Sequence, residues 1–309
     1  MGNRRIVVTG GAGFIGSHLV DRLAAIEAGT ILVLDNLHRP CVDDPQIWPK
    51  GVLFAPLDIR NRSEVASALK DCDVVFHLAA QSNVMGAVLN AEFAFDTNVM
   101  GTFNVLQAAK AAGAKRLVLT SSREVYGEVE NLPVAETAPL RPKNAYGASK
   151  VAGELYCGIA AGEGLETVVL RLANVYGPRD RGRVIPLFFE AARAGKSLEI
   201  YGGDQVLDFV WIDTVVDALL KAAFGEWIAE PVNIGSGQGV TLRVLADRIT
   251  EIAGSAAPTR IVPARREEVR RFVADISRAR RIWDLPLPGD PLTHLPMLLH
   301  QPVSENFRA

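Results

Sequence analysis

Residues 5–25, RIVVTGGAGFIGSHLVDRLAA, decide the fold that we expect for this chain. A turn with glycines at positions 10, 13 and 16 lies between an apolar strand, RIVV, and an amphipathic helix, FIGSHLVDRLAA. Glycine permits a tight turn and a close approach of the backbone to a ligand, and the amides and dipole of a helix N-terminus attract phosphate. A strand, a glycine turn and a helix in this order are typical of a site that binds the pyrophosphate of a dinucleotide.

The second apolar strand, ILVLD, ends on Asp35, 19 residues after Gly16. A carboxylate there accepts hydrogen bonds from both ribose hydroxyls of NAD and repels the 2′-phosphate of NADP. Asn36 and Leu37 follow it and bring no arginine that would neutralise such a phosphate, although Arg39 lies close by. We therefore predict that the cofactor is NAD.

Short apolar runs alternate with amphipathic stretches through the first 174 residues, and the runs are RIVV, ILVLD, DVVFHLAA, RLVLTSS and TVVLRLANV. Strands that are apolar on both faces belong to a parallel sheet covered by helices. We predict an α/β fold with a doubly wound parallel-sheet Rossmann domain over residues 1–174, to which residues 208–235 return. A smaller mixed substrate-binding region is expected over residues 175–309, with a loosely ordered, proline-rich tail from Leu285.

Composition argues for a small-molecule partner. Lys and Arg number 33 against 35 Asp and Glu, so the net charge of -2 offers no attraction to nucleic acid or to an anionic membrane. No apolar run approaches the ~20 residues that a spanning helix needs. The cysteines, Cys41, Cys72 and Cys157, are odd in number and far apart, which argues against a disulfide framework and favours the cytoplasm. The five histidines show no ligand spacing, and we predict no metal site.

Ser122, Tyr146 and Lys150 form a candidate catalytic set. Tyr146 and Lys150 in NAYGASK are four residues apart and share one helix face. A phenol with its ordinary pKa near ~10 is a poor base, but an ammonium and a positive nicotinamide stabilise the phenolate. Ser122 ends the preceding strand, at the sheet edge where ligands bind, and can hold the substrate oxygen whose proton Tyr146 takes. This set predicts proton and hydride transfer.

Together these motifs resemble the extended short-chain dehydrogenase/reductases, specifically the nucleotide-sugar epimerase and dehydratase family. The resemblance runs from residue 4 to about 240, and more faintly to about 284, through TGGAGFIGSH, LDNL, HLAAQ, NVMGT, SSREVYG, YGASK, NVYGPR and NIGSG. It implies a nucleotide-sugar substrate, a catalytic role for Ser122, Tyr146 and Lys150, and a homodimer formed through the helices of residues 91–112 and 146–163. It also implies that Asn98 supports the active-site helix.

The motifs and the resemblance define the binding residues that we expect. The expected cofactor site comprises Gly10, Gly13, Phe14, Ile15, Gly16, Asp35, Asn36, Asp58, Ile59, Leu78, Ala79, Ala80, Asn98, Tyr146 and Lys150, with Asp58 as an adenine contact. The expected substrate site comprises Asn174, Arg183, Val184, Tyr201 and Arg265.

Residues 123 and 124 bear on the type of reaction. Sugar 4,6-dehydratases of the family carry an Asp-Glu pair here, an acid for the leaving oxygen and a base for the C5 proton. Arg123 replaces the acid, and a guanidinium is no proton donor at neutral pH. In an epimerase Ser, Tyr and Lys suffice, because NAD⁺ removes hydride from C4, the 4-keto sugar turns, and hydride returns to the other face. The resemblance therefore favours 4-epimerisation of a UDP-hexose.

Glu124 keeps other reactions open as a fourth catalytic candidate. Nucleotide-sugar decarboxylases retain a hydroxyl and a Glu with this spacing, and 5,6-dehydratases of the family can also lack the Asp. Alternatively, Glu124 is only an ion-pair partner of Arg123 or of a surface lysine. A non-catalytic NAD sensor on the same fold is a further alternative, although such proteins usually lose the tyrosine or the lysine.

Two departures from the family pattern affect the substrate side. Leu207 stands where relatives commonly have an arginine that grips the nucleotide diphosphate. Arg265 or Arg266, assisted by Arg183, could replace it. Ala87 stands where many relatives have a serine that contacts the sugar.

Overall fold

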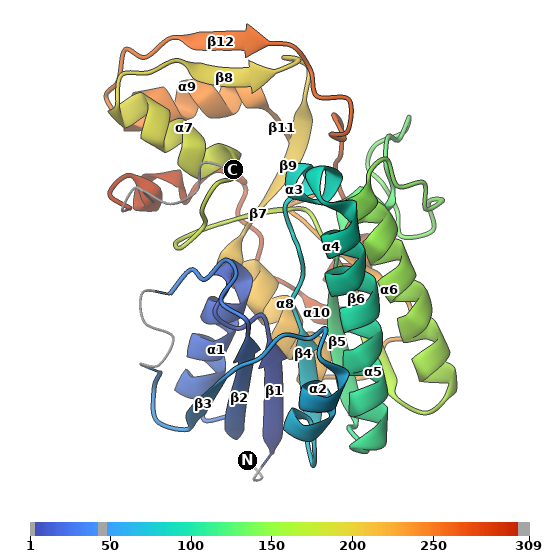
Figure 1. Ribbon diagram of the computed structural model, residues 1–309. Coiled ribbons are helices and arrows are strands. Elements are labelled where there is room, and N and C mark those ends of the chain that lie inside the picture. The colour runs from blue at the N-terminus through green and yellow to red at the C-terminus, as the bar shows by residue number, and fades with distance from the viewer. Residues whose placement is uncertain (1–3, 43–47, 302–309) are drawn as a thin grey trace.

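Seven parallel strands form the large sheet of the protein, in the order β10-β6-β5-β4-β1-β2-β3. The computed structural model describes residues 4–42 and 48–301, and its ribbon is drawn in Figure 1. The strands are β1 (Arg5–Thr9), β2 (Thr30–Asp35), β3 (Val52–Pro56), β4 (Val74–His77), β5 (Arg116–Ser122), β6 (Glu166–Leu172) and β10 (Val232–Ile234).

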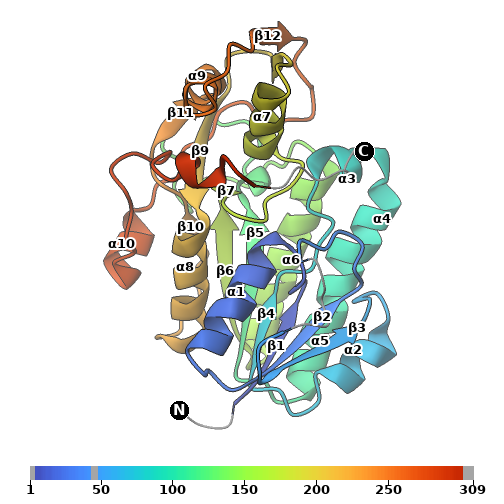
Figure 2. The same cartoon turned by 90° about the vertical axis from the view of Figure 1, so that its left-hand side faces the viewer.

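Helices cover both faces of this sheet, as Figure 2 shows with the sheet between them. One face carries α1 (Phe14–Ala25) and α8 (Ile212–Phe224), and the other carries α2 (Arg62–Ala68), α5 (Gly101–Ala111) and α6 (Ala145–Gly162). The apolar side chains of β1 alternate between the two faces: Ile6 and Val8 join the core beneath α1, and Val7 joins the core beneath α2 and α5. The predicted doubly wound α/β fold is confirmed.

The strand order reverses beside β1. The chain moves from β1 to β2 on one side and later places β4 on the other, with Thr9 level with Leu34 and with His77. Ligands of doubly wound sheets bind at such a point, outside the carboxyl ends of the strands. The register therefore brings the glycine turn and the residues after β4 to one edge.

A smaller part lies over this edge of the sheet (Figure 1). It holds a three-stranded sheet of β11 (Gly239–Thr241), β9 (Val206–Trp211) and β7 (Asn174–Tyr176), and a two-stranded parallel sheet of β12 (Thr259–Val262) and β8 (Leu198–Tyr201). Its helices are α7 (Val184–Arg193) and α9 (Leu242–Ile252), whereas α10 (Ser277–Trp283) packs against β10 of the large sheet. In the described part of the chain, every helix is too short or too polar to cross a bilayer.

The helical stretch that we expected over residues 91–112 contains a change of geometry. It consists of α4 (Ala91–Phe95), a π-helical turn at Asp96–Met100 and then α5, and it is preceded by α3 (Val84–Leu89). Single π turns inside helices occur frequently at functional sites. A 3₁₀ turn, Arg123–Val125, follows β5.

The described part of the C-terminal tail, residues 285–301, is packed, so our prediction of loose order from Leu285 is wrong there. Residues 302–309, to which the prediction also extends, lie outside the described residues. Leu292, Leu295 and Leu298 are buried, the last two within a 3₁₀ turn at Leu295–Leu298. The Tyr176 hydroxyl donates to the Pro291 carbonyl over 2.5 Å. Proline content misleads here because the leucines between the prolines bury enough apolar surface to hold the segment.

Candidate active site

A cavity of about 1110 Å³ lies between the carboxyl edge of the large sheet and the smaller part. The predicted site residues come from both parts, and the structure describes all of them. Those that line the cavity are Gly10, Gly13, Phe14, Ile15, Gly16, Asp35, Asn36, Ile59, Leu78, Ala79, Ala80, Ser122, Glu124, Tyr146, Lys150, Asn174, Arg183, Val184, Tyr201 and Arg265. Asp58 and Asn98 are the two that do not line it.

The glycine turn forms one end of the cavity. Gly10 has φ +71°, and a Cβ there would lie 2.6 Å from the Ala79 amide nitrogen, so only glycine lets the residues after β4 pass so closely. A Cβ on Gly16 would lie 2.1 Å from the Gly10 carbonyl oxygen, which is why α1 can begin directly against the turn. Gly13 caps α1 without a side-chain hydrogen bond, so the first amides of the helix remain available to an anion.

Asp35 ties the end of β2 to this turn. Its carboxylate accepts hydrogen bonds from the Ala12 amide over 3.0 Å and from the Leu37 amide over 2.8 Å. Burial raises the pKa of Asp35 above its ordinary value, while these two amides lower it. Each carboxylate oxygen keeps a lone pair for a further donor, as recognition of a ribose diol requires.

Asp58 is bound within its own loop. Its carboxylate accepts two hydrogen bonds from the Arg60 guanidinium, at 3.0 and 2.7 Å, and one from the Asn36 amide at 3.0 Å. These partners, Arg60 first, hold the pKa of Asp58 well below its usual range. The predicted adenine contact stays a prediction.

The predicted catalytic tyrosine, Tyr146, is placed by the start of α6. Asn144 caps this helix by accepting the Gly147 amide over 2.8 Å, and Tyr146 follows on the first turn. Burial raises the pKa of Tyr146 to about 12, whereas its hydrogen bond with the Ser122 side chain and the charge of Arg183 lower it. In the ligand-free protein the phenol is therefore protonated. It is hydrogen-bonded to Ser122, the serine that we expected beside it.

Lys150 lies one turn further along the same face. Its ammonium donates to the Thr120 carbonyl over 3.0 Å and is 5.8 Å from the centre of the Tyr146 ring. Burial lowers the pKa of Lys150 to about 8, and the negative charge of Glu154 opposes that shift. The structure thus brings Ser122, Tyr146 and Lys150 together from β5 and α6.

Glu124 lines the same cavity, but its carboxylate already has two partners. One oxygen is 3.1 Å from an Arg123 guanidinium nitrogen, and the other accepts the Asn144 amide over 2.8 Å. Both members of the ion pair are largely buried, with side chains 13% and 5% exposed. Asn144 also donates to the Glu267 carbonyl over 3.0 Å, so Glu124 helps to hold the start of α6.

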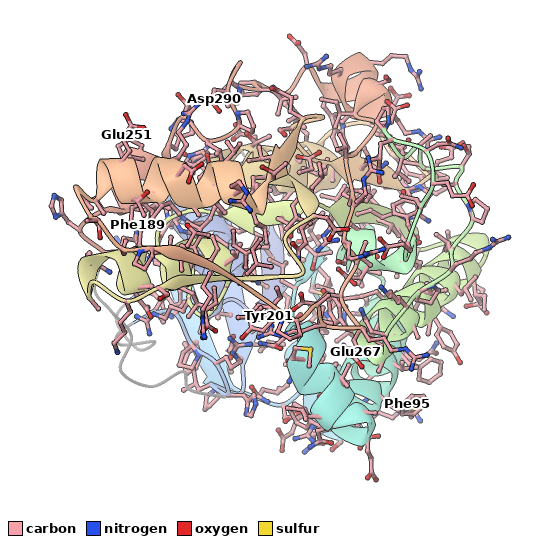
Figure 3. The ribbon with its side chains drawn as sticks, turned by 90° about the horizontal axis from the view of Figure 1, so that it is seen from above. Phe95, Phe189, Tyr201, Glu251, Glu267 and Asp290 are labelled. Carbon is pink, nitrogen blue, oxygen red and sulfur yellow. The ribbon has the colours of Figure 1, made fainter. Side chains whose placement is uncertain are left out.

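The smaller part supplies four arginines to the cavity, Arg181, Arg183, Arg260 and Arg265, of which Arg183 and Arg265 were predicted. Arg265 lies over the Tyr201 ring, 3.7 Å from its centre, and pairs with Glu268 at 2.9 Å. Figure 3 places Tyr201 near the centre of the molecule when it is viewed from above. Arg183 lies elsewhere, over the Phe14 ring of the glycine turn at 5.3 Å, so the two predicted arginines serve different parts of the cavity.

The remaining positions expected on the substrate side lie in β7, β9 and α3. Asn174 donates to the Asp208 carbonyl over 3.0 Å, which joins these two strands beside the cavity. Leu207 lines the cavity with an apolar side chain, and Ala87 is fully buried. Neither position offers the polar contact that the resemblance would place there.

Sequence analysis missed several residues that shape the site. Thr120 receives the Lys150 ammonium, Asn144 links the helix cap to Glu124, and Gln81 lines the cavity while pairing with Asn98. Only Asn144 carries a recognisable signal, since an asparagine directly before a helical pattern is typical of an N-cap. The other contacts depend on which strands and helices are neighbours.

Comparison with known proteins identifies the family. A family model described as "NAD dependent epimerase/dehydratase family" matches residues 6–235. The chain belongs to this family. It is 38% identical over 286 residues to a putative UDP-glucose 4-epimerase of Methanocaldococcus jannaschii, covering 90% of this chain and 92% of that protein. It is 33% identical to UDP-glucuronic acid decarboxylase 6 of Arabidopsis thaliana, covering 91% and 84%. The UDP-glucose 4-epimerase of Thermotoga maritima, solved with UDP-glucose, superposes with a TM-score of 0.89 at 32% identity and covers 96% of this chain and 97% of its own.

The family is NAD-dependent, as we predicted for this chain. The residues present fit that cofactor. The uncapped start of α1 offers amides to a pyrophosphate, and Asp35 retains acceptor capacity for a ribose. Tyr146 and Lys150 line the same cavity, where a nicotinamide would meet a substrate.

Proposed function

We propose that this member of the family is a nucleotide-sugar 4-epimerase that acts on a UDP-hexose through a transient 4-keto sugar. The observation that carries the proposal is the pairing of Glu124 with Arg123 and Asn144 at 3.1 and 2.8 Å. Both oxygens of the Glu124 carboxylate are thereby engaged, so removal of a C5 proton by this group would first have to break one of these contacts. The groups that a 4-epimerase needs lie together in the cavity, where Tyr146 is hydrogen-bonded to the Ser122 side chain and Lys150 to the Thr120 carbonyl.

Tyr146 transfers the proton, and Ser122 and Lys150 support it. Ser122 holds the C4 hydroxyl of the sugar beside Tyr146, whose phenolate takes the hydroxyl proton and later returns it. Lys150 stabilises that phenolate with its charge, and its bond to the Thr120 carbonyl keeps the ammonium in place. NAD⁺, which the glycine turn and Asp35 would hold in the same cavity, would supply the oxidation at C4 by taking up a hydride. The nucleotide end of the substrate lies with Tyr201 and Arg265, where an aromatic face and a cation meet.

The similarity to both epimerases and a decarboxylase defines the test. Purified enzyme is incubated with UDP-glucose, UDP-galactose and UDP-glucuronate, and the products are identified by NMR. Interconversion of the two neutral hexoses supports the proposal. Carbon dioxide released from UDP-glucuronate, without any inverted hexose, refutes it and favours the second candidate, a decarboxylase that uses Glu124. That candidate rests on the place of Glu124 in the wall of the cavity.

We also propose a homodimer, formed through the α4–α5 stretch and α6. These helices expose Phe95, Met100, Leu155, Tyr156 and Ile159, with Leu155 63% and Ile159 57% exposed. Figure 3 shows Phe95 at the outer edge of the molecule. α4 and α5 both pack against α6, and large exposed apolar side chains gathered on neighbouring helices are typical of a protein interface. Ile159→Glu should convert the dimer to a monomer in analytical ultracentrifugation, and a wild-type protein that sediments as a monomer would contradict the proposal.

The cysteines support a further part of the proposal, a reducing cytoplasmic location. All three thiols are free, and Cys72 and Cys157 are buried away from oxidants. Burial raises the pKa of both thiols, to about 11 and about 12, so neither ionises readily. Fractionation of the source cells should place the activity with cytoplasmic markers, and recovery with secreted proteins would contradict this location.

A further inference from the structure

A buried line of hydrogen bonds runs beneath the cavity from the end of β1 to α5. The Thr9 hydroxyl is 2.7 Å from His77 Nδ1, and His77 Nε2 is 2.9 Å from the Thr102 hydroxyl. Thr102 in turn donates to the Asn98 carbonyl over 2.6 Å. All four residues are buried, and His77 is 1% exposed.

The direction of each bond follows from the number of protons available. Thr102 has one hydroxyl proton, which the Asn98 carbonyl receives, so His77 Nε2 must be the donor toward Thr102. In a neutral imidazole Nδ1 is then the acceptor, and Thr9 donates to it while accepting the Ala79 amide over 3.3 Å. Burial and the positive charge of Lys150 lower the pKa of His77 to about 3, so the ring is neutral at every working pH.

The line continues from Asn98 to the catalytic helix. The Asn98 side chain accepts the Gln81 amide over 2.7 Å and donates to the Gln81 carbonyl and to the Ser149 hydroxyl over 3.1 and 2.9 Å. Ser149 then donates to the Tyr146 carbonyl over 2.7 Å. Every polar atom of the Asn98 side chain is used, and the path reaches the backbone of the residue that acts as the base.

The π turn gives Asn98 its place in this path. Asn98 lies within the turn Asp96–Met100, where the helix is wound more loosely than an α-helix. The Thr102 hydroxyl reaches back one turn to the Asn98 carbonyl, and His77 holds that hydroxyl from the sheet side. The imidazole therefore connects the strands that carry the cofactor loops to the turn that supports α6.

We propose that His77 and Thr102 are positioning residues, which hold the π turn of Asn98 against the cofactor strands and so set the place of Tyr146 relative to the nicotinamide. Neither side chain is among those that line the cavity, so each acts through Asn98, Gln81 and Ser149. The inference rests on the proposed function only in taking Tyr146 as the base of the first C4 oxidation. Epimerisation and decarboxylation of a nucleotide sugar share that step.

Thr102 allows a matched comparison. Thr102→Val keeps the shape and removes the hydroxyl, whereas Thr102→Ser keeps the hydroxyl. In the cofactor-free protein, hydrogen exchange at the Ala79 and Gln81 amides should become at least ~10-fold faster in Thr102→Val and return toward the wild-type rate in Thr102→Ser. In the loaded enzyme, Thr102→Val should lower kcat by ~10- to 100-fold with KM within ~3-fold of wild type, because misplacement of a catalytic group by about 1 Å costs up to that factor.

A second pair of variants covers the case in which Thr102→Val does not fold. His77→Gln places an amide nitrogen near the position of Nε2 and keeps the donation to Thr102, whereas His77→Asn reaches only the Thr9 side. We expect His77→Gln to turn over at least ~10-fold faster than His77→Asn, for the same reason of base placement. Equal rates in this pair, or Thr102→Val with wild-type exchange and wild-type kcat, would overturn the inference.

Loss of the 4-epimerase proposal can be distinguished from loss of the inference on His77 and Thr102. If the wild-type enzyme releases carbon dioxide instead of inverting C4, the 4-epimerase proposal is lost, and the same variants are compared on that reaction. The exchange measurement needs no substrate and tests the path by itself.

Discussion

Glu124→Gln separates the two roles that Glu124 can have. In the structure its carboxylate forms an ion pair with Arg123 at 3.1 Å and accepts a hydrogen bond from Asn144 at 2.8 Å. A glutamine keeps one acceptor and turns an NH₂ group toward the other donor, and it leaves Arg123 buried without its counter-charge. Removing one partner of a buried ion pair costs about 3–5 kcal/mol of unfolding free energy. At ~2 °C per kcal/mol for a chain of this size, Tm should fall by roughly 6–10 °C.

The same variant should remain an active 4-epimerase. We expect kcat/KM within ~10-fold of wild type when the assay is run well below the lowered Tm, because loss of a general base would cost ~100- to 10,000-fold. Thermal unfolding followed by circular dichroism measures the first quantity, and a UDP-galactose formation assay measures the second. The control, Arg123→Met with Glu124→Gln, removes both charges and should recover most of the lost stability. An unchanged Tm together with abolished turnover would refute the reasoning and assign Glu124 a direct role in the chemistry.

Three further predictions test the site. Tyr146→Phe should lower kcat by ~100-fold or more while NAD stays bound, and unchanged turnover would point to another base. Lys150→Met should abolish turnover yet raise Tm at pH 7, because wild-type folding buries an ammonium whose pKa falls from 10.5 to about 8. Between pH 8 and pH 10.5 the unfolded wild-type chain binds one more proton than the folded chain, so the free energy of unfolding of the wild type rises with pH over this range. The stability advantage of Lys150→Met over the wild type should therefore shrink there, and thermal unfolding at several pH values measures it. Asp35→Ser should weaken NAD binding by ~10-fold or more and raise affinity for NADP relative to NAD in titration calorimetry, since it removes a charged acceptor for the ribose.

Local patterns predicted the parts of the site that depend on short stretches of chain. Gly10 adopts φ +71° in the turn, Gly16 makes a close contact with the Gly10 carbonyl within the same strand-turn-helix unit, and Asp35 ends the next strand in the expected place. The spacing of Tyr146 and Lys150 fixes their shared helix face wherever the helix packs. These features need no knowledge of the tertiary structure.

Hydrogen-bond and ion-pair partners that come from different helices and strands could not be predicted from local sequence patterns. Glu124 could be interpreted equally well as a base or as an ion-pair partner, and only the packing of Arg123 and Asn144 around it favours the second. No local pattern singled out His77, because its partners Thr9 and Thr102 come from the neighbouring strand and from α5, a helix on one face of the sheet. The proline-rich tail failed as a prediction for a related reason, since its order comes from leucines that bury against distant elements.

The central claim is that chemistry is confined to C4, and the fate of hydrogen during turnover tests it most directly. UDP-glucose is converted in deuterium oxide, and the sugar products are examined by NMR at C4 and C5. The proposed mechanism predicts UDP-galactose with no solvent deuterium on carbon, because the hydrogen taken from C4 is the one returned there. Deuterium at C5, or a product that has lost water, would contradict it.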